Sequence, residues 1–143
     1  MNPEREWIAA APLAAMAQAA ESAFPEECCG MLLGRRTARG WNIVAARAMR
    51  NASAKPGLGF EFEAREQLQA YREADAAGLE IFGHYHSHPN DRRGPSPADL
   101  QLARERCDRG LWLILAVAHG KLTEASLWQL HGEPGEFQRI IQV

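Results

Sequence analysis

The chain has 143 residues, of which 46% are hydrophobic and 24% charged, a balance typical of a single globular domain spanning residues 1–143. Its formal net charge of −2 and the scattered positions of its 16 Lys and Arg residues argue against a nucleic-acid partner. No apolar run approaches the roughly 20 residues of a membrane helix, and the start MNPEREW lacks the basic and apolar parts of a signal peptide, so we expect a cytoplasmic protein without a membrane partner.

The first part of the chain predicts a helix followed by two strands. Residues 11–24 are typical of a helix, because Leu13, Met16 and Ala20 recur on one face at helical spacing, and Pro25 closes this segment. The further elements expected here are strands over 28–34 and 41–49, joined by 35–40, and a loop rich in small residues, Pro and Gly over 51–59.

The middle of the chain predicts a second helix between two strands. Leu68, Tyr71 and Asp75 follow one another at helical steps, and Gly78 stands where a helix would end, because glycine readily adopts the positive φ found there. The elements expected in this part are a short strand over 60–62, a helix over 64–78 and a strand over 79–88.

The last part of the chain has a clear helix start. Ser96 is a typical N-cap, Pro97 suits the first helical position, and Asp99 follows three residues after the cap, so we expect a helix over 96–110. The run 111–118 is continuously apolar, which favours a central strand. Strands over 122–130 and 137–143, separated by the turn-rich segment 131–136, complete the set. This element order predicts an α/β fold with helices packed on a mixed β-sheet.

The three cysteines suit a reducing compartment. Cys28, Cys29 and Cys107 are odd in number and two are adjacent, which favours free thiols over a disulfide framework. We expect them to pack as small hydrophobic side chains, with metal binding as a second interpretation.

The sequence GHYHSHP, residues 83–89, places histidines in alternation on an expected strand. Side chains two residues apart share one face of a strand, so His86 and His88 project side by side while Ser87 faces away. Two neutral imidazoles are half of a tetrahedral zinc site, and Asp99 at the next helix start is the nearest candidate for a third ligand. Two histidines and one carboxylate leave a fourth position open, which is typical of catalytic zinc sites that activate water.

These residues also have structural interpretations. SPAD, residues 96–99, has the pattern of a capping box, which alone favours helix capping over metal binding. A hydrolytic zinc site also needs a base that accepts a proton from water. Glu26 and Glu27 stand immediately before an apolar strand; Glu26 is interpreted as part of a solvated turn, and Glu27 as the candidate base.

Two separated elements resemble one family. HSHP, six residues and SPAD are similar to the signature of the JAMM (MPN-plus) zinc metalloproteases: His-x-His-Pro, a spacer, then Ser-x-x-Asp. PEECCG, residues 25–30, is similar to the upstream Pro-x-Glu-x-Cys-Gly element of that family. The resemblance covers most of the chain, Asn51 included, and the joint match is highly specific. It implies the fold of MPN domains, a cytidine-deaminase-like α/β/α sandwich.

The resemblance implies a role for each matching residue. His86, His88 and Asp99 would bind one zinc ion per chain. Glu27 would hold and deprotonate the attacking water and then pass the proton to the leaving amine. Ser96 would stabilise the developing oxyanion by hydrogen bonding, a role that is electrostatically plausible beside its position as helix N-cap.

Other polar residues near these motifs carry weaker signals. His84 departs from the family pattern, in which a bulky aromatic residue is frequent; we expect it to line the strand, with a partner of the ligands or a spare ligand as alternatives. His119 and His131 adjoin glycines in expected turns, which favours exposure. Arg92 and Arg93 follow the zinc motif and could meet an acidic group of a substrate, although ordinary solvated arginines are the favoured interpretation.

The compact chain resembles the minimal bacterial branch of the family more than the eukaryotic deubiquitinating members with their inserted segments. Members of that branch are thought to trim the C-terminus of small ubiquitin-like sulfur-carrier proteins, or to release an amino acid from their Gly-Gly end. The resemblance therefore implies a zinc metallopeptidase or isopeptidase acting on such a tail. Two alternatives remain: a metal-free or latent MPN scaffold in a protein assembly, and a zinc hydrolase or deaminase of small molecules, against which the absence of Cys-x-x-Cys counts.

Overall fold

The computed structural model describes residues 7–38 and 40–142. Its three helices are α1 (Ala10–Ala23), α2 (Ala64–Ala76) and α3 (Pro97–Arg106). Its strands are β1 (Trp7–Ile8), β2 (Cys29–Thr37), β3 (Gly40–Met49), β4 (Glu80–His88), β5 (Leu111–Ala118), β6 (Lys121–His131) and β7 (Glu136–Gln142). None of these helices has the length and apolarity that crossing a bilayer requires.

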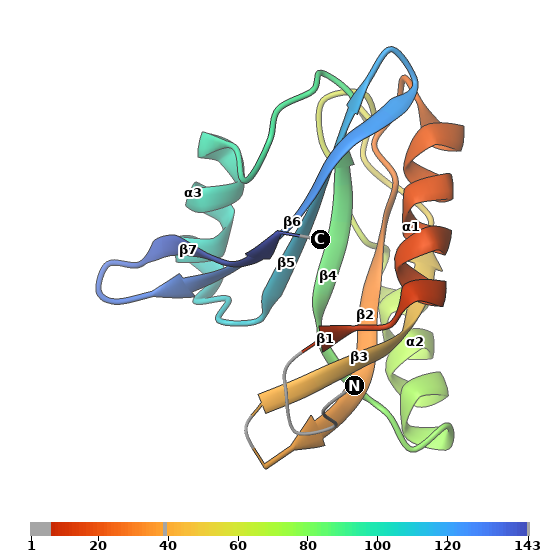
Figure 1. The fold of residues 1–143 in the computed structure, drawn as a ribbon, viewed down its shortest axis with the longest axis vertical. Helices are drawn as coiled ribbons and strands as arrows, with labels where there is room; N and C mark the ends of the chain where they lie inside the picture. Colours follow the sequence, from red (N-terminus) through yellow and green to blue (C-terminus); the bar gives the residue numbers. More distant parts are fainter. Residues whose placement is uncertain (1–6, 39, 143) are drawn as a thin grey trace.

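All the strands join one mixed sheet in the order β1-β3-β2-β4-β5-β6-β7, with β4 in the middle (Figure 1). β4 pairs with β5 in parallel and with β2 in the antiparallel sense. The parallel neighbours need a crossover connection, which the loop after β4 and helix α3 provide. The carboxyl end of β4 therefore opens into this connection, and the side chains there are free to meet the start of α3.

Strand alternation places the helices in layers on the two faces of the sheet. Leu113 of β5 belongs to the core cluster of α1, whereas its neighbour Trp112 belongs to the cluster of α3. On β2, Leu32 belongs to the core cluster of α1, and its neighbour Met31 belongs to the cluster of α2. Met31, His84 and Trp112 are register partners across three adjacent strands. Helices α2 and α3 therefore cover the same face and α1 the opposite one, which confirms the expected α/β architecture.

The predicted helices and the main strands are confirmed with shifted ends. The strand predicted over 111–118 has the observed bounds, and Gly78 follows α2 with a φ of +70°. The helix predicted over 96–110 ends at Arg106, because Cys107 adopts a left-handed conformation. The last strand was predicted to reach Val143, which lies outside the described residues.

Two expectations were wrong, the strand over 60–62 and the packing of Cys107. Residues 60–62 form no strand: β2, β3 and β4 already have neighbours on both sides, and Phe60 and Phe62 pack instead on the α2 side of the sheet. The helical spacing of Leu68 and Tyr71 is confirmed in α2, where both side chains are half exposed because alanines provide the buried face of the helix. Cys107 is exposed at the end of α3 and does not pack as a small hydrophobic residue, although it is a free thiol as expected.

Candidate active site

Two buried histidines lie at the carboxyl end of β4. His86 and His88 share the face that α2 and α3 cover, and their side chains are 0% and 7% exposed. Ser87, between them, faces α1 and binds the start of β2: its hydroxyl accepts from the Cys28 N–H at 2.8 Å, and its own N–H donates to the Cys28 carbonyl at 3.0 Å. These two bonds hold the residue before Cys28, which is Glu27, beside the histidines.

Asp99 completes a triangle of donor atoms with the two histidines. Its Oδ2 atom lies 3.3 Å from His86 Nε2 and 3.1 Å from His88 Nε2, and the two Nε2 atoms are 3.2 Å apart. Ligand atoms on a tetrahedral zinc ion with bonds of about 2.0–2.1 Å are about 3.3–3.4 Å apart. The three side chains therefore have the spacing of three corners of a zinc tetrahedron, with the fourth corner left free of these ligands.

The tautomer of His88 strengthens this fit. Its Nδ1 atom lies 3.1 Å from the carbonyl oxygen of Arg92, and because a carbonyl only accepts, Nδ1 carries the proton. Neutral His88 then points the Nε2 lone pair at the Asp99 carboxylate, which is also an acceptor. Two acceptors at 3.1 Å require a cation or a proton between them, and a nitrogen and oxygen donor set suits zinc.

The helix cap and the donor triangle use the same carboxylate. Asp99 Oδ2 accepts from the Ser96 N–H at 2.8 Å, and the Asp99 N–H donates to Ser96 Oγ at 3.0 Å, which is a complete capping box. The capping interpretation is thus confirmed without displacing Asp99 from the histidines. Ser96 accepts through an oxygen lone pair, so its hydroxyl hydrogen stays available for a second partner.

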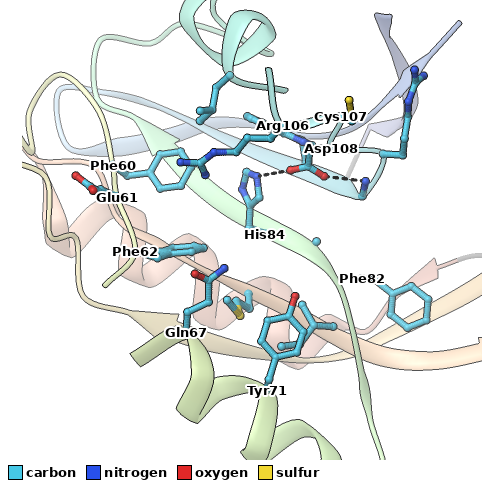
Figure 2. Close-up of a pocket in the computed structure, with 17 residues that line it drawn as sticks. Phe60, Glu61, Phe62, Gln67, Tyr71, Phe82, His84, Arg106, Cys107 and Asp108 are labelled. Carbon is cyan, nitrogen blue, oxygen red and sulfur yellow. Dashed lines mark hydrogen bonds and ion pairs between the residues drawn. The ribbon is translucent and has the colours of Figure 1, made fainter. Parts of the chain in front are cut away.

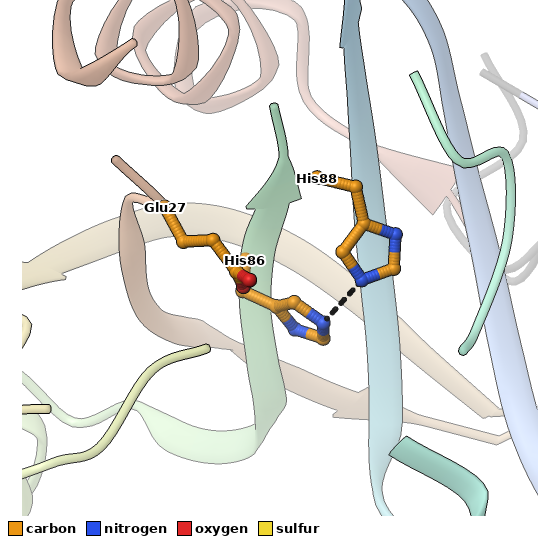
Figure 3. A group of neighbouring side chains, drawn as sticks. All are labelled: Glu27, His86 and His88. Carbon is orange, nitrogen blue, oxygen red and sulfur yellow. Dashed lines mark hydrogen bonds between the residues drawn. The ribbon is translucent and has the colours of Figure 1, made fainter. Parts of the chain in front are cut away.

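Glu27 is the fourth polar side chain of the site. It is 8% exposed, and its carboxylate, His86 and His88 offer ligand atoms that all lie within 4.8 Å of one another (Figure 3). Burial raises the pKa of Glu27 to about 7, from an ordinary value of 4.5, and His88 offsets part of that rise. A carboxylate with a pKa near neutrality is well suited to accept and return a proton. Glu26, by contrast, is exposed, as expected for a solvated turn.

Burial and hydrogen bonding shift the pKa values of the three side chains of the triangle in different directions. Burial alone would raise the pKa of Asp99, but hydrogen bonds from His86 and His88 outweigh it and hold this pKa well below its usual range. Burial lowers the pKa of His86 more than Asp99 raises it. For His88, burial is outweighed by Asp99 and the Arg92 carbonyl, so its pKa is raised. Asp99 is therefore ionised and His86 neutral, the states that metal ligands need, whereas a metal at His88 must displace the proton that Asp99 favours there.

Two residues that sequence reasoning did not assign to the site support it. The ring of Phe60 stacks on His86, with centroids 4.4 Å apart. The Asn51 side-chain amide donates to the carbonyls of Glu27 at 3.0 Å and Gly59 at 2.9 Å, while its Oδ1 accepts from the Ser53 N–H at 3.1 Å. Asn51 thereby fastens the loop 51–59 against the site. The Asn-x-Ser pattern of an Asx turn was a usable signal; the stacking of Phe60 was not.

Two cavities, one at the site and one beside it, share the lining residues Phe60 and Leu102. The site cavity has a volume of about 230 Å³. Four of the assigned residues line it: Glu27, His88, Ser96 and Asp99. The loop 57–60 and the residues Pro89, Asn90 and Arg92 form further parts of its wall. The β4 cavity, of about 550 Å³, lies between α2 and α3 over residues 81–84 (Figure 2).

His84 lies in the β4 cavity and outside the donor triangle. Its ring packs edge-on against Trp112 with centroids 4.3 Å apart, and its Nε2 is 3.8 Å from an Asp108 carboxylate oxygen (Figure 2). Burial lowers the pKa of His84 to about 3, so the ring is neutral. It lines the strand, as expected, and its Nε2 faces Asp108. His119 and His131 are exposed, also as expected.

Several known proteins are similar to this chain. It is 34% identical over 79 residues to a desampylase of Haloferax volcanii and 35% identical over 75 residues to a desampylase of Pyrococcus furiosus; the matches cover 55% and 52% of this chain. They cover 55% and 50% of those proteins, so the chain spans about half the length of the curated relatives it matches.

Solved structures share the whole fold. A protein from Desulfitobacterium hafniense has a TM-score of 0.79 and 26% identity, with 96% of this chain and 92% of that chain covered. A protein from Salinibacter ruber has a TM-score of 0.72 and 29% identity, with 94% and 88% covered. Residues 9–131, most of the chain, match the family described as prokaryotic homologs of the JAB domain. The chain therefore belongs to this family, a minimal JAMM-type branch, as the spacing of its motifs predicted.

Proposed function

We propose that the chain is a zinc-dependent metallopeptidase or isopeptidase that cleaves an amide bond at or near the C-terminal Gly-Gly tail of a small ubiquitin-like, sulfur-carrier protein. The observation that carries the proposal is the triangle of His86, His88 and Asp99 donor atoms with 3.1–3.3 Å edges, beside the buried carboxylate of Glu27. The name of the two relatives, desampylase, supports a ubiquitin-like substrate. The cytoplasmic location stays a prediction.

The roles of the residues follow from their positions. His86, His88 and Asp99 would hold zinc, which when bound lowers the pKa of water to near 7 and polarises a carbonyl oxygen. Glu27 accepts the proton of the attacking water at its carboxylate and delivers it to the nitrogen of the leaving amine. The C–N bond breaks, and the products are a carboxylate on the tail and a free amine. Asn51 and Phe60 keep Glu27 and His86 in place.

The hydroxyl of Ser96 is suited to donate a hydrogen bond to the oxyanion of the reaction. Its oxygen already accepts from the Asp99 N–H, so its remaining hydrogen can donate to the oxygen of the scissile carbonyl as negative charge develops there. Ser96 also lines the site cavity together with Glu27 and His88. One hydroxyl thus serves as helix cap through its lone pair and as oxyanion donor through its proton.

The shape of the cavities favours a thin, extended substrate. The β4 cavity has aromatic walls, among them Phe60, Phe62 and Trp112, and Phe60 and Leu102 form its junction with the site cavity. A tail of glycines has no side chains to pass that junction. An extended peptide lying over β4 would bring its last carbonyl between Ser96 and Glu27.

Ser96→Ala should lower turnover by about 10²–10³-fold, because one oxyanion donor is lost. It should also destabilise the protein by about 1 kcal/mol through the lost helix cap. Ser96→Gly removes the same hydroxyl but costs the helix only a few tenths of a kcal/mol. Steady-state kinetics and thermal unfolding of both variants separate the two effects. Equal turnover in the parent and both variants would remove Ser96 from the reaction.

The proposed function is tested by substrate cleavage and metal exchange together. The purified protein is incubated with small ubiquitin-like proteins whose Gly-Gly end is extended by one residue or joined to a lysine, and products are read by mass spectrometry. We expect cleavage directly after the second glycine, loss of activity after chelation, and recovery with one equivalent of zinc per chain. No zinc after reconstitution, and no cleavage, would replace this proposal by the scaffold alternative.

A further inference from the structure

The loop after β4 holds Arg92 in a fixed place next to the site. Its carbonyl accepts from His88 Nδ1 at 3.1 Å, and its N–H donates to Asn90 Oδ1 at 3.1 Å. The preceding Asp91 donates its N–H to the Val117 carbonyl at 3.0 Å and accepts from the Thr123 hydroxyl through Oδ1. The backbone of Arg92 is thus tied to a donor of the triangle and to β5 and β6.

Arg92 is exposed and lines the site cavity. Among the described residues, it is the one Lys or Arg that lines the site cavity, and no carboxylate pairs with it. The adjacent Arg93 differs, because its Nε lies 3.7 Å from Asp91 Oδ1. Arginine binds carboxylates through two parallel N–H bonds, so an unpaired one on an anchored loop is a ready site for a carboxylate.

The order of features along β4 fixes which part of a substrate meets Arg92. The β4 cavity lies over residues 81–84, the donor triangle uses residues 86 and 88, and Arg92 follows on the far side. The β4 cavity is the larger of the two, which suits the tail. The group released from the tail then lies in the smaller site cavity, next to Arg92. A single amino acid attached through its amine presents its α-carboxylate there.

We propose that Arg92 binds the α-carboxylate of the residue released from the Gly-Gly end, so that the enzyme prefers a peptide-linked terminal amino acid to an isopeptide-linked lysine. This inference rests on the proposed function and specifies its substrate class. Water adds across the C–N bond, and the products are the Gly-Gly carboxylate and a free amino acid. A lysine joined through Nζ carries its α-carboxylate at the far end of its side chain, beyond this contact.

Three substrates on one ubiquitin-like protein ending in Gly-Gly test the inference. They carry after the second glycine an alanine with a free carboxylate, an alanine amide, or an acetyl-lysine amide joined through Nζ. The parent should cleave the free-carboxylate substrate at least about tenfold faster in kcat/KM than the other two, since one charge-assisted pair distinguishes them. Arg92→Ala should abolish this preference, mainly through a higher KM for the free-carboxylate substrate.

Two variants control for structural effects. Arg92→Lys keeps the positive charge but loses the paired N–H donors of the guanidinium, so it should keep part of the preference for the free-carboxylate substrate. Arg93→Ala should keep all of this preference. Zinc content should equal that of the parent in each, because the bond to His88 comes from the backbone of Arg92. Equal rates of the parent on carboxylate and amide substrates would overturn the inference alone. Failure of the parent to cleave any of the three would overturn the proposed function and the inference with it.

Discussion

His88→Ala should reduce the zinc content of the protein from about one per chain to near zero, as expected when one of three ligands is lost. Hydrolysis should fall by about a thousandfold or more, because Lewis-acid stabilisation of the transition state amounts to several kcal/mol. His88 Nε2 forms two edges of the donor triangle, to His86 at 3.2 Å and to Asp99 at 3.1 Å. Its loss also leaves the buried Asp99 carboxylate with less compensation. Elemental analysis and steady-state kinetics measure the two effects.

His84→Ala is the matched control for this experiment. His84 is on the same strand and the same face, two residues before His86, but it packs against Trp112 and lines the β4 cavity. It should keep the zinc content of the parent even if the lost ring lowers the unfolding temperature. Equal zinc loss in His84→Ala and His88→Ala would mean that zinc depends on the packing of β4 and not on the donor triangle. Full zinc in His88→Ala would remove that residue as a ligand.

The parts of the site that are local in sequence were predictable. His86 and His88 share a face because strands repeat every two residues, and SPAD marks a helix start because of its cap. Both predictions needed only short spacings and are confirmed in the described residues. The sequence alone did not show that one carboxylate serves both cap and triangle. That coincidence depends on the path of the loop 89–96, which brings the start of α3 back over the end of β4.

The parts that depend on competition between segments were not predictable. Phe60 is an aromatic residue of the kind that is common in strands. The strands β2, β3 and β4 have no free edge for another strand, so Phe60 stacks on His86 instead. Leu68 and Tyr71 have helical spacing, yet small alanines face the sheet at α2 and leave these larger residues at the surface. Spacing reports which residues share a face, whereas the side of the helix that is buried depends on how closely it packs.

Glu27→Gln should keep the zinc of the parent and lower turnover by about 10²–10⁴-fold, the usual contribution of a positioned general base. The amide is nearly isosteric with the carboxylate but cannot accept the proton of water. Glu26→Gln is the matched control: it changes the same side chain one residue earlier, where it is exposed, and should keep both zinc and activity. A Glu27→Gln variant as active as the parent would show that another group takes the proton.

The pKa of Glu27 gives this assignment a second, independent readout in metal-free protein. Burial raises that pKa from 4.5 to about 7, so between these values the folded chain holds a proton that the unfolded chain has lost. The folded state therefore loses stability as pH rises through this window, by about 3 kcal/mol at most, and Glu27→Gln should remove the loss. Urea unfolding of chelated protein at pH 5 and pH 8 measures it. The quantity to compare is the unfolding free energy of the parent minus that of Glu27→Gln. If this difference does not fall between pH 5 and pH 8, the pKa of Glu27 is not raised by burial, and the reason why this residue is a base near neutral pH is lost.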